Sequence, residues 1–147
     1  MTVELFAPSD RARMDAALAL RIAVFVDEQR IPLDEEIDAY DDPAADAVHA
    51  LVRAEDGSVL GTGRYYREDA ATARIGRMAV APAGRGRGVG LALLEALTAH
   101  ARAAGFTRAV LNAQEHALGF YARAGFAPDA ETNLDAGIVH REMRRPL

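Results

Sequence analysis

The sequence predicts one domain with a mixed α/β fold, in which helices cover both faces of a single sheet. Three observations support this fold class. The chain has 147 residues, which is enough for one hydrophobic core and too few for two. Segments with strand-like apolar alternation are interleaved along the chain with segments of helical periodicity. At the centre of the chain, residues 74–105 form a strand, a glycine-rich turn and a long helix.

A change of apolar period defines this central unit. Residues 74–81 carry apolar side chains at strand spacing, and Pro82 ends the strand. Gly105 stands where a left-handed glycine ends a helix. The apolar positions between them follow i, i+3, i+4, i+7 and i+11, which is one face of a helix, and they are Gly90, Leu93, Leu94, Leu97 and Ala101.

The remaining elements follow from similar signals. A helix capped by Ser9 or Asp10 is expected to run to about Phe25. The strand that follows the long helix is expected to lie parallel to the central strand, because a helix crosses between them. We expect strands at 2–6, 47–54, 59–66, 74–81, 108–111, 126–130 and 137–143, and a last helix at 115–124.

Composition excludes several classes of protein and mechanism. The net charge of −5 argues against a nucleic-acid-binding protein, and no run of 18 apolar residues predicts a membrane span. The N-terminus shows no signal-peptide pattern. The chain has no cysteine and no lysine, and its two serines have no histidine in a recognisable constellation. A group that this protein transfers is therefore expected to move directly between bound ligands.

The turn of the central unit, residues 84–90, has the sequence GRGRGVG and the features of an anion-binding site. Its alternating glycines let the backbone turn sharply and let a ligand approach the amides. The free N–H groups at the start of the following helix, with the positive end of the helix dipole behind them, point into the turn. Arg85 and Arg87 add positive charge. These features predict a phosphate ligand, and a pyrophosphate above all.

Two common phosphate motifs do not match this turn. A Walker loop requires a lysine, and all 17 basic residues of the chain are arginines. A dinucleotide fingerprint requires GxGxxG and an acidic residue about 20 positions further on, and both are missing. Arg85, Gly88 and Gly90 instead form the pattern R-x-x-G-x-G after a strand that ends in V-x-P. With this motif the sequence resembles the Gcn5-related N-acetyltransferase (GNAT) superfamily, whose members use it to hold the pyrophosphate of acetyl-coenzyme A.

Two further stretches are similar to the ElaA/YjcF-like branch of this superfamily. One is 21–32, followed by 36–38 and His49, and the other is 111–126, followed by 137–140. The resemblance covers nearly the whole chain and implies a single N-acetyltransferase domain over residues 1–147. The implied fold is a mostly antiparallel sheet of six to seven strands, with a central parallel pair and helices on both faces.

The resemblance also implies acetyl-coenzyme A (acetyl-CoA) as co-substrate and a set of residues that contact it. The central strand supplies backbone groups that pair with the pantetheine and polarise the acetyl carbonyl. The four histidines lack the spacing of a metal site, so no metal is expected. The residues expected to bind the coenzyme are Met78, Ala79, Val80, Arg85, Gly86, Arg87, Gly88, Val89, Gly90, Asn112 and His116.

Acetyl transfer from a thioester to an amine needs an acid for the leaving thiolate and a base for the amine. Tyr121 matches the family tyrosine that faces the coenzyme sulfur and is the expected acid. The alternative role for Tyr121 is a core residue packed between Phe120 and Phe126. His49 and Glu28 are the candidate bases, and the alternative for His49 is a structural histidine on an alternating strand.

The segment 24–46 contains nine acidic residues and one arginine. It is either a solvated loop or an acidic wall beside a site for a cationic amine. Within it, Glu36 and Asp38 are expected to bind the substrate, and they are also rival bases.

Two arginines and two histidines remain. Arg64 and Arg77 lie on strands that are otherwise apolar. They either pair with acids of the segment 24–46 or hold a substrate carboxylate. His140, on a late strand, is expected to bind the substrate, whereas His100 is expected to be structural.

The predicted function is N-acetyl transfer from acetyl-CoA to a primary amine of a small molecule, within a ternary complex. The main alternative is a non-catalytic acyl-CoA-binding sensor or regulatory protein, and Tyr121 argues for catalysis because a sensor needs no phenol there. A nucleotide hydrolase is disfavoured by the missing lysine and the missing acidic metal site. We expect a cytoplasmic monomer or homodimer that binds neither nucleic acid nor membrane.

Overall fold

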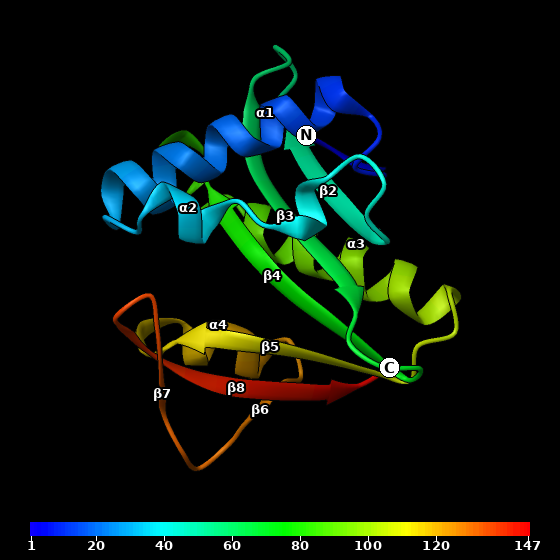
Figure 1. Cartoon of the computed structure of the whole chain (residues 1–147), viewed down its shortest axis with the longest axis vertical. Helices are drawn as coiled ribbons and strands as arrows, with labels where there is room; N and C mark the ends of the chain where they lie inside the picture. Colours follow the sequence, from blue (N-terminus) through cyan, green and yellow to red (C-terminus); the bar gives the residue numbers. More distant parts are fainter.

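The computed structural model describes all 147 residues and consists of one eight-stranded sheet with helices on both faces (Figure 1). The strand order is β1-β2-β3-β4-β5-β8-β6, with β7 also paired to β8, and every pair except β4–β5 is antiparallel. In chain order the elements are β1 (Thr2–Phe6), α1 (Arg11–Arg21), η1 (Ile22–Glu28), α2 (Leu33–Glu36), η2 (Ala39–Asp41), β2 (Ala47–Arg53), β3 (Val59–Arg67), β4 (Thr72–Val80), η3 (Pro82–Gly84), α3 (Val89–Ala103), β5 (Arg108–Gln114), η4 (Glu115–Ala117), α4 (Leu118–Arg123), β6 (Ala127–Pro128), β7 (Asn133–Asp135) and β8 (Ile138–Pro146).

The predicted fold class is confirmed, with one strand more than expected. The segment expected to be a turn before the last strand contains β7, which pairs with β8, so the sheet has eight strands instead of six or seven. The first predicted helix ends early: α1 stops at Arg21, and the chain continues to Glu28 as the π-helix η1. Strand β5 extends to Gln114, beyond its predicted end, and β6 is reduced to Ala127–Pro128.

The larger core lies between the sheet and α3. Leu93, Leu94 and Leu97 are buried there, together with apolar residues of β2, β4 and β5. Helix α3 can approach the sheet closely because β3 has a glycine beneath it. A Cβ at Gly61 would lie 2.5 Å from Val89, so a larger residue at this position would push the helix away. The apolar helix face predicted from the sequence is the face that packs.

Helix α1 covers the opposite face of the sheet. Its N-cap is Asp10, whose carboxylate accepts a hydrogen bond from the backbone N–H of Arg13 at 3.3 Å. A smaller core forms under it, in which Met14 packs with Phe6 and Leu51. Figure 1 shows α1 and α2 on one face of the sheet and α3 on the other. None of the helices combines the length and the apolar composition needed to cross a membrane.

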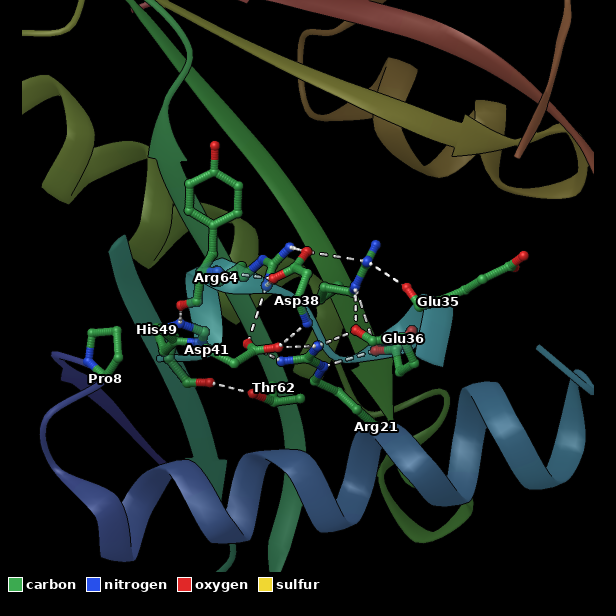
Figure 2. A network of polar contacts seen from close by, with 12 residues as sticks. Pro8, Arg21, Glu35, Glu36, Asp38, Asp41, His49, Thr62 and Arg64 are labelled. Carbon is green, nitrogen blue, oxygen red and sulfur yellow. Dashed lines mark hydrogen bonds and ion pairs between the residues drawn. The ribbon is translucent and has the colours of Figure 1, made fainter. Parts of the chain in front are cut away.

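A network of charged side chains is buried between α1 and the sheet (Figure 2). Arg21, only 1% exposed, donates from Nε to Glu36 at 2.8 Å and from its two terminal nitrogens to both oxygens of Asp41 at 2.6 and 3.0 Å. Arg64 of β3 donates to Asp41 at 3.1 Å and to Asp38 at 2.7 Å. Buried charges are tolerated when they are paired and hydrogen-bonded in this way.

Arg77 of β4 completes this network. Its Nη2 donates to Asp38 at 3.3 Å, and its Nε lies 3.5 Å from a carboxylate oxygen of Glu36. Pairing of Arg64 and Arg77 with acids of the segment 24–46, one of two alternatives from the sequence, is therefore confirmed. We call the set of three arginines and three carboxylates the arginine–carboxylate network: Arg21, Arg64, Arg77, Glu36, Asp38 and Asp41.

Asp41 receives hydrogen bonds from two arginines of the network, and we expect its replacement to destabilise the fold in a pH-dependent way. Burial alone would raise the pKa of Asp41, but hydrogen bonds from Arg21 and from the backbone N–H of Asp38 lower this pKa to about 2. A carboxyl with a folded-state pKa below its unfolded value of about 3.9 stabilises the fold above about pH 4. That stabilisation is lost as the pH falls towards 2.

The variant Asp41→Asn leaves buried guanidinium groups without their charge partner. We expect the free energy of unfolding near pH 7 to fall by about 3–5 kcal/mol, and the difference from wild type to shrink as the pH falls below about 4. Urea unfolding at several pH values measures both effects. Asp42→Asn is the matched control, since Asp42 is the exposed neighbour and forms no ion pair. An Asp41 variant as stable as this control would contradict the structural role of the network.

Candidate active site

A cavity of about 610 Å³ opens where β4 and β5 diverge. The two strands pair in parallel only between Thr72–Arg74 and Arg108–Val110, and from Ile75 onward they separate (Figure 1). Residues of η1 and α2 line the cavity on one side, and residues of η4, α4 and β8 line it on the other. The divergence leaves the facing edges of both strands without a strand partner. Backbone groups at such edges need another hydrogen-bond partner, which a ligand can supply.

Strand β4 is bulged where it faces the cavity. Arg77 and Met78 together oppose the single residue Gly63 of β3. Arg77 has a φ of +51°, a left-handed conformation that is unfavourable for a residue with a side chain. Its guanidinium donates to the carbonyl oxygens of Glu35 and Glu36 at 3.1 and 3.2 Å. Because a bulge changes the direction of the strand, these contacts hold the bend of β4 beside the cavity.

The turn between β4 and α3 continues from the cavity edge at Arg85. Gly86 and Gly88 have φ values of +75° and +78°, and a Cβ at either glycine would meet no atom within 4 Å. The backbone N–H groups of both glycines, and those of residues 89–91, donate to no acceptor in the protein. These five donors stand at the N-terminus of a helix of 15 residues. The turn therefore has the free donors and the open space that an anion requires.

Arg85 forms an ion pair across the cavity edge with Glu28 of η1. Its Nη2 lies 2.9 Å from both carboxylate oxygens, and its Nε donates to the carbonyl oxygen of Val80 at 3.1 Å. Nearly half of each charged side chain is exposed, 48% and 42% respectively, so the pair adds little stability. Arg87 forms no ion pair, and its one hydrogen bond goes to the carbonyl oxygen of Ala83 at 3.3 Å. Both arginines are thus available to a ligand anion.

Tyr121 of α4 lies in the cavity wall, and its hydroxyl makes no hydrogen bond to the protein. Its ring packs edge-on against Phe120 and Phe126, with centroid distances of 5.0 and 6.2 Å. Burial raises the pKa of the phenol to about 12. The hydroxyl is therefore protonated at neutral pH and has a proton to donate.

Three further polar residues predicted for the site line the cavity from β5, η4 and β8. Asn112 exchanges side-chain hydrogen bonds with Asn133, with donor–acceptor distances of 2.9 Å. The Nε2 of His116 lies 2.7 Å from the amide oxygen of Gln114. His140 is 7% exposed. This side of the cavity is therefore lined by hydrogen-bonding side chains, among them the carboxylate of Asp135, which accepts from Asn112 at 3.3 Å.

The structure brings most of the predicted site residues together. Met78, Ala79, Val80, Arg85, Asn112, His116, Tyr121, Glu28, Glu36 and His140 line the cavity. Gly86, Arg87, Gly88, Val89 and Gly90 form the adjoining turn and the start of α3. Asp38 and His49 do not line the cavity. No group of three or more His, Asp or Glu side chains is placed to hold a metal ion.

Three expectations from the sequence need correction. His49 is 1% exposed, donates from Nε2 to the carbonyl oxygen of Tyr40 at 3.0 Å and stacks on Phe6, and burial lowers its pKa. The structure therefore places it in the core, away from a substrate amine. Glu36 and Asp38 do not form a free acidic wall, because the arginine–carboxylate network already matches their charge.

Several polar residues of the cavity were not identified from the sequence. They are Tyr66, Gln29, Gln114 and Asp135. Gln114 donates to Gln29 at 2.8 Å, which joins β5 to η1. These residues meet only in the folded protein, and no local pattern marks them. The bulge of β4 did leave a signal, because a glycine inside a strand pattern, here Gly76, often marks a bulge.

Comparison with known proteins places this geometry in a family. Residues 15–126 match the sequence model of the Acetyltransferase (GNAT) family. The Bacillus subtilis protein described as uncharacterized N-acetyltransferase YjcF is 35% identical over 130 residues, which cover 88% of this chain and 89% of YjcF. An acyl-CoA N-acyltransferase from Pseudomonas aeruginosa is 34% identical with a TM-score of 0.84 over 98% of both chains. Escherichia coli ElaA is 31% identical with a TM-score of 0.84 over 99% of both chains. The chain therefore belongs to the acetyltransferase (GNAT) family, in its ElaA/YjcF-like branch.

Proposed function

We propose that this protein transfers an acetyl group from acetyl-CoA directly to a primary amine of a small molecule, with both substrates bound at once. The observation that carries the proposal is the juxtaposition of three features in one place. These are the unpaired edge of β4, the anion-binding turn that follows it, and the free phenol of Tyr121. Membership in the acetyltransferase family supports the reaction class.

The residues present fit the coenzyme. The free N–H groups of Gly86, Gly88 and the first turn of α3 would hold its pyrophosphate, and Arg87 would add a charge-assisted contact. Met78 and Val80 lie on the unpaired edge of β4 and would pair their backbone groups with the pantetheine. When bound, acetyl-CoA supplies an acetyl group that its thioester activates for transfer.

The chain itself must polarise the acetyl carbonyl and protonate the leaving sulfur. Backbone N–H groups of the bulged strand are suited to the first task, because they are fixed in place before substrate binds. Tyr121 is suited to the second task, because its proton stays on the oxygen at neutral pH and no protein group competes for it. The absence of cysteine and lysine leaves direct transfer as the simplest route.

A thiol-release assay tests this proposal. Acetyl-CoA is incubated with the protein and a panel of primary amines and amino sugars, and free thiol is measured. We expect amine-dependent thiol release with at least one member of the panel. Calorimetric binding of acetyl-CoA with no transfer to any amine would instead indicate an acyl-CoA-binding sensor, and absence of binding would contradict both functions.

The role of the turn predicts that Arg87→Ala weakens acetyl-CoA binding without affecting the fold. A hydrogen bond to a charged group contributes about 1.5–3 kcal/mol, so we expect the Kd to rise about tenfold or more. Arg102→Ala is the matched control, because it removes the same charge from the exposed far end of α3. Calorimetry measures both variants. Equal affinities for the two variants would contradict a phosphate contact at Arg87.

The role of Tyr121 predicts that Tyr121→Phe lowers turnover by about 10²–10⁴-fold, the contribution of a general acid. Coenzyme affinity and the melting temperature should change little, because the ring still packs against Phe120 and Phe126 and the hydroxyl has no protein partner to lose. The measurement is kcat together with Tm for this one variant. A normal kcat with a lowered Tm would make Tyr121 a structural residue.

A further inference from the structure

His140 is a buried polar side chain for which the fold supplies only one of two hydrogen-bond partners. It lies on β8, opposite Gln114 of β5 and Asn133 of β7, and is 7% exposed in the cavity wall. Its Nδ1 lies 2.7 Å from the carbonyl oxygen of Ile138. Because a carbonyl oxygen only accepts, Nδ1 carries the hydrogen of the neutral ring, and Nε2 carries the lone pair. That Nε2 has no hydrogen-bond partner in the protein.

The other three histidines do not share this arrangement. His49 is in the core and donates its Nε2 hydrogen to a backbone carbonyl. His100 lies on the exposed side of α3, with its Nδ1 bonded to a tyrosine hydroxyl at 2.6 Å. His116 is exposed, and its Nε2 is bonded to a glutamine side chain at 2.7 Å. His140 alone combines a buried ring, a fixed tautomer and a free acceptor nitrogen at the cavity.

The carboxylates of the cavity are less suited to take a proton. Glu36 is hydrogen-bonded to Arg21, and Glu28 lies at the cavity edge beside Arg85 of the anion-binding turn. A substrate amine would have to displace the guanidinium of Arg21 to reach Glu36, whereas the side chain of Glu28 is 42% exposed to solvent. The remaining acids of the lining, in α2 and at the end of β7, are exposed to solvent. A buried imidazole with a free lone pair is the group of this cavity best suited to general base catalysis.

We propose that Nε2 of His140 is the general base that deprotonates the acceptor amine, an assignment that rests on the proposed function. The acceptor enters as an ammonium group with three protons and becomes nucleophilic when it loses one. That proton passes to Nε2 and then to solvent. As the C–N bond forms and the C–S bond breaks, Tyr121 gives its proton to the sulfur. A second proton leaves the nitrogen for solvent, and the phenolate of Tyr121 takes a proton back from solvent. The products are the amide, the free thiol and one proton in solution.

Two variants separate proton transfer from hydrogen bonding. His140→Asn keeps an N–H donor near the carbonyl of Ile138 and removes the acceptor at Nε2. His140→Gln places an amide group near the position of Nε2 that can hydrogen-bond but cannot take a proton at neutral pH. His100→Gln is the matched control on a histidine remote from the cavity. Thermal unfolding identifies any variant that has lost its fold, and two different replacements keep the test informative.

The probes are ethylamine and 2,2,2-trifluoroethylamine, which differ little in size. Near neutral pH ethylamine is almost entirely protonated, whereas trifluoroethylamine is largely neutral and needs no base to become nucleophilic. We expect kcat/KM for ethylamine to fall about 100-fold or more in both His140 variants, and that for trifluoroethylamine to fall less than about tenfold. The His100 variant should match wild type with both amines. Equal losses with both amines, or recovery in His140→Gln, would overturn the assignment.

A second measurement does not depend on activity. Nitrogen NMR of the unliganded protein reports the tautomer of each histidine, and the signal absent from His140→Asn identifies this residue. We expect the Nδ1–H tautomer, and an Nε2–H tautomer would overturn the proposal because the acceptor lone pair would then be missing. If wild-type protein acetylates ethylamine and the His140 variants lose kcat/KM equally for both amines, only the assignment of His140 is overturned. Wild-type protein that transfers to no amine overturns the proposed function, and the assignment with it.

Discussion

The separation of β4 from β5 is the constraint on which the rest of the site depends. The two strands share only three residue pairs before they part, whereas β5 continues along β8 for seven pairs and β4 continues along β3. The sheet is therefore two halves that are joined at one end and open at the other (Figure 1). Unpaired strand edges inside a fold are unfavourable unless something satisfies their backbone groups. In this protein the open end is the cavity, and a ligand that pairs with β4 completes the sheet.

The arginine–carboxylate network holds one side of this opening. It fixes the segment between α1 and β2 over β3 and β4 (Figure 2). Arg77 belongs both to the network and to the bulge of β4. A left-handed non-glycine residue persists only where its surroundings determine it. The contacts of Arg77 with Asp38 and with the carbonyl oxygens of Glu35 and Glu36 hold it in this conformation. The network thus links the stability of the N-terminal half to the shape of the strand that lines the cavity.

The sequence predicted what depends on local pattern. The apolar face of α3, the turn with Gly86 and Gly88, and the parallel placement of β5 follow from periodicity, glycine positions and connection rules, and the structure contains each of them. The excess of acidic residues in the segment 24–46 was also evident from the sequence. What the sequence did not specify was which arginine each acid would meet, because residues 15 to 41 positions apart come together only through packing.

The two strand histidines show the same limit in a single residue type. His49 and His140 both lie on strands in which successive side chains point to opposite faces of the sheet. This alternation predicts which face each histidine occupies, but not which element packs on that face. Helix α1 and the network cover His49, and its pKa is lowered by burial. The cavity adjoins His140. Similarly, β7 was not predicted because a strand of three residues has too few positions to show a period.

The arginines and carboxylates of the arginine–carboxylate network pair with one another, and the remaining charges of the cavity favour two different ligands. Arg85, beside the turn, holds Glu28 in an exposed pair that a phosphate can replace at little cost. Glu35 and Asp135 line the same cavity from α2 and β7, and neither side chain forms an ion pair. Under the proposed function, an anionic coenzyme and a cationic amine would therefore have separate attractive groups in the cavity. This separation of charge is consistent with the proposed direct transfer between two bound substrates.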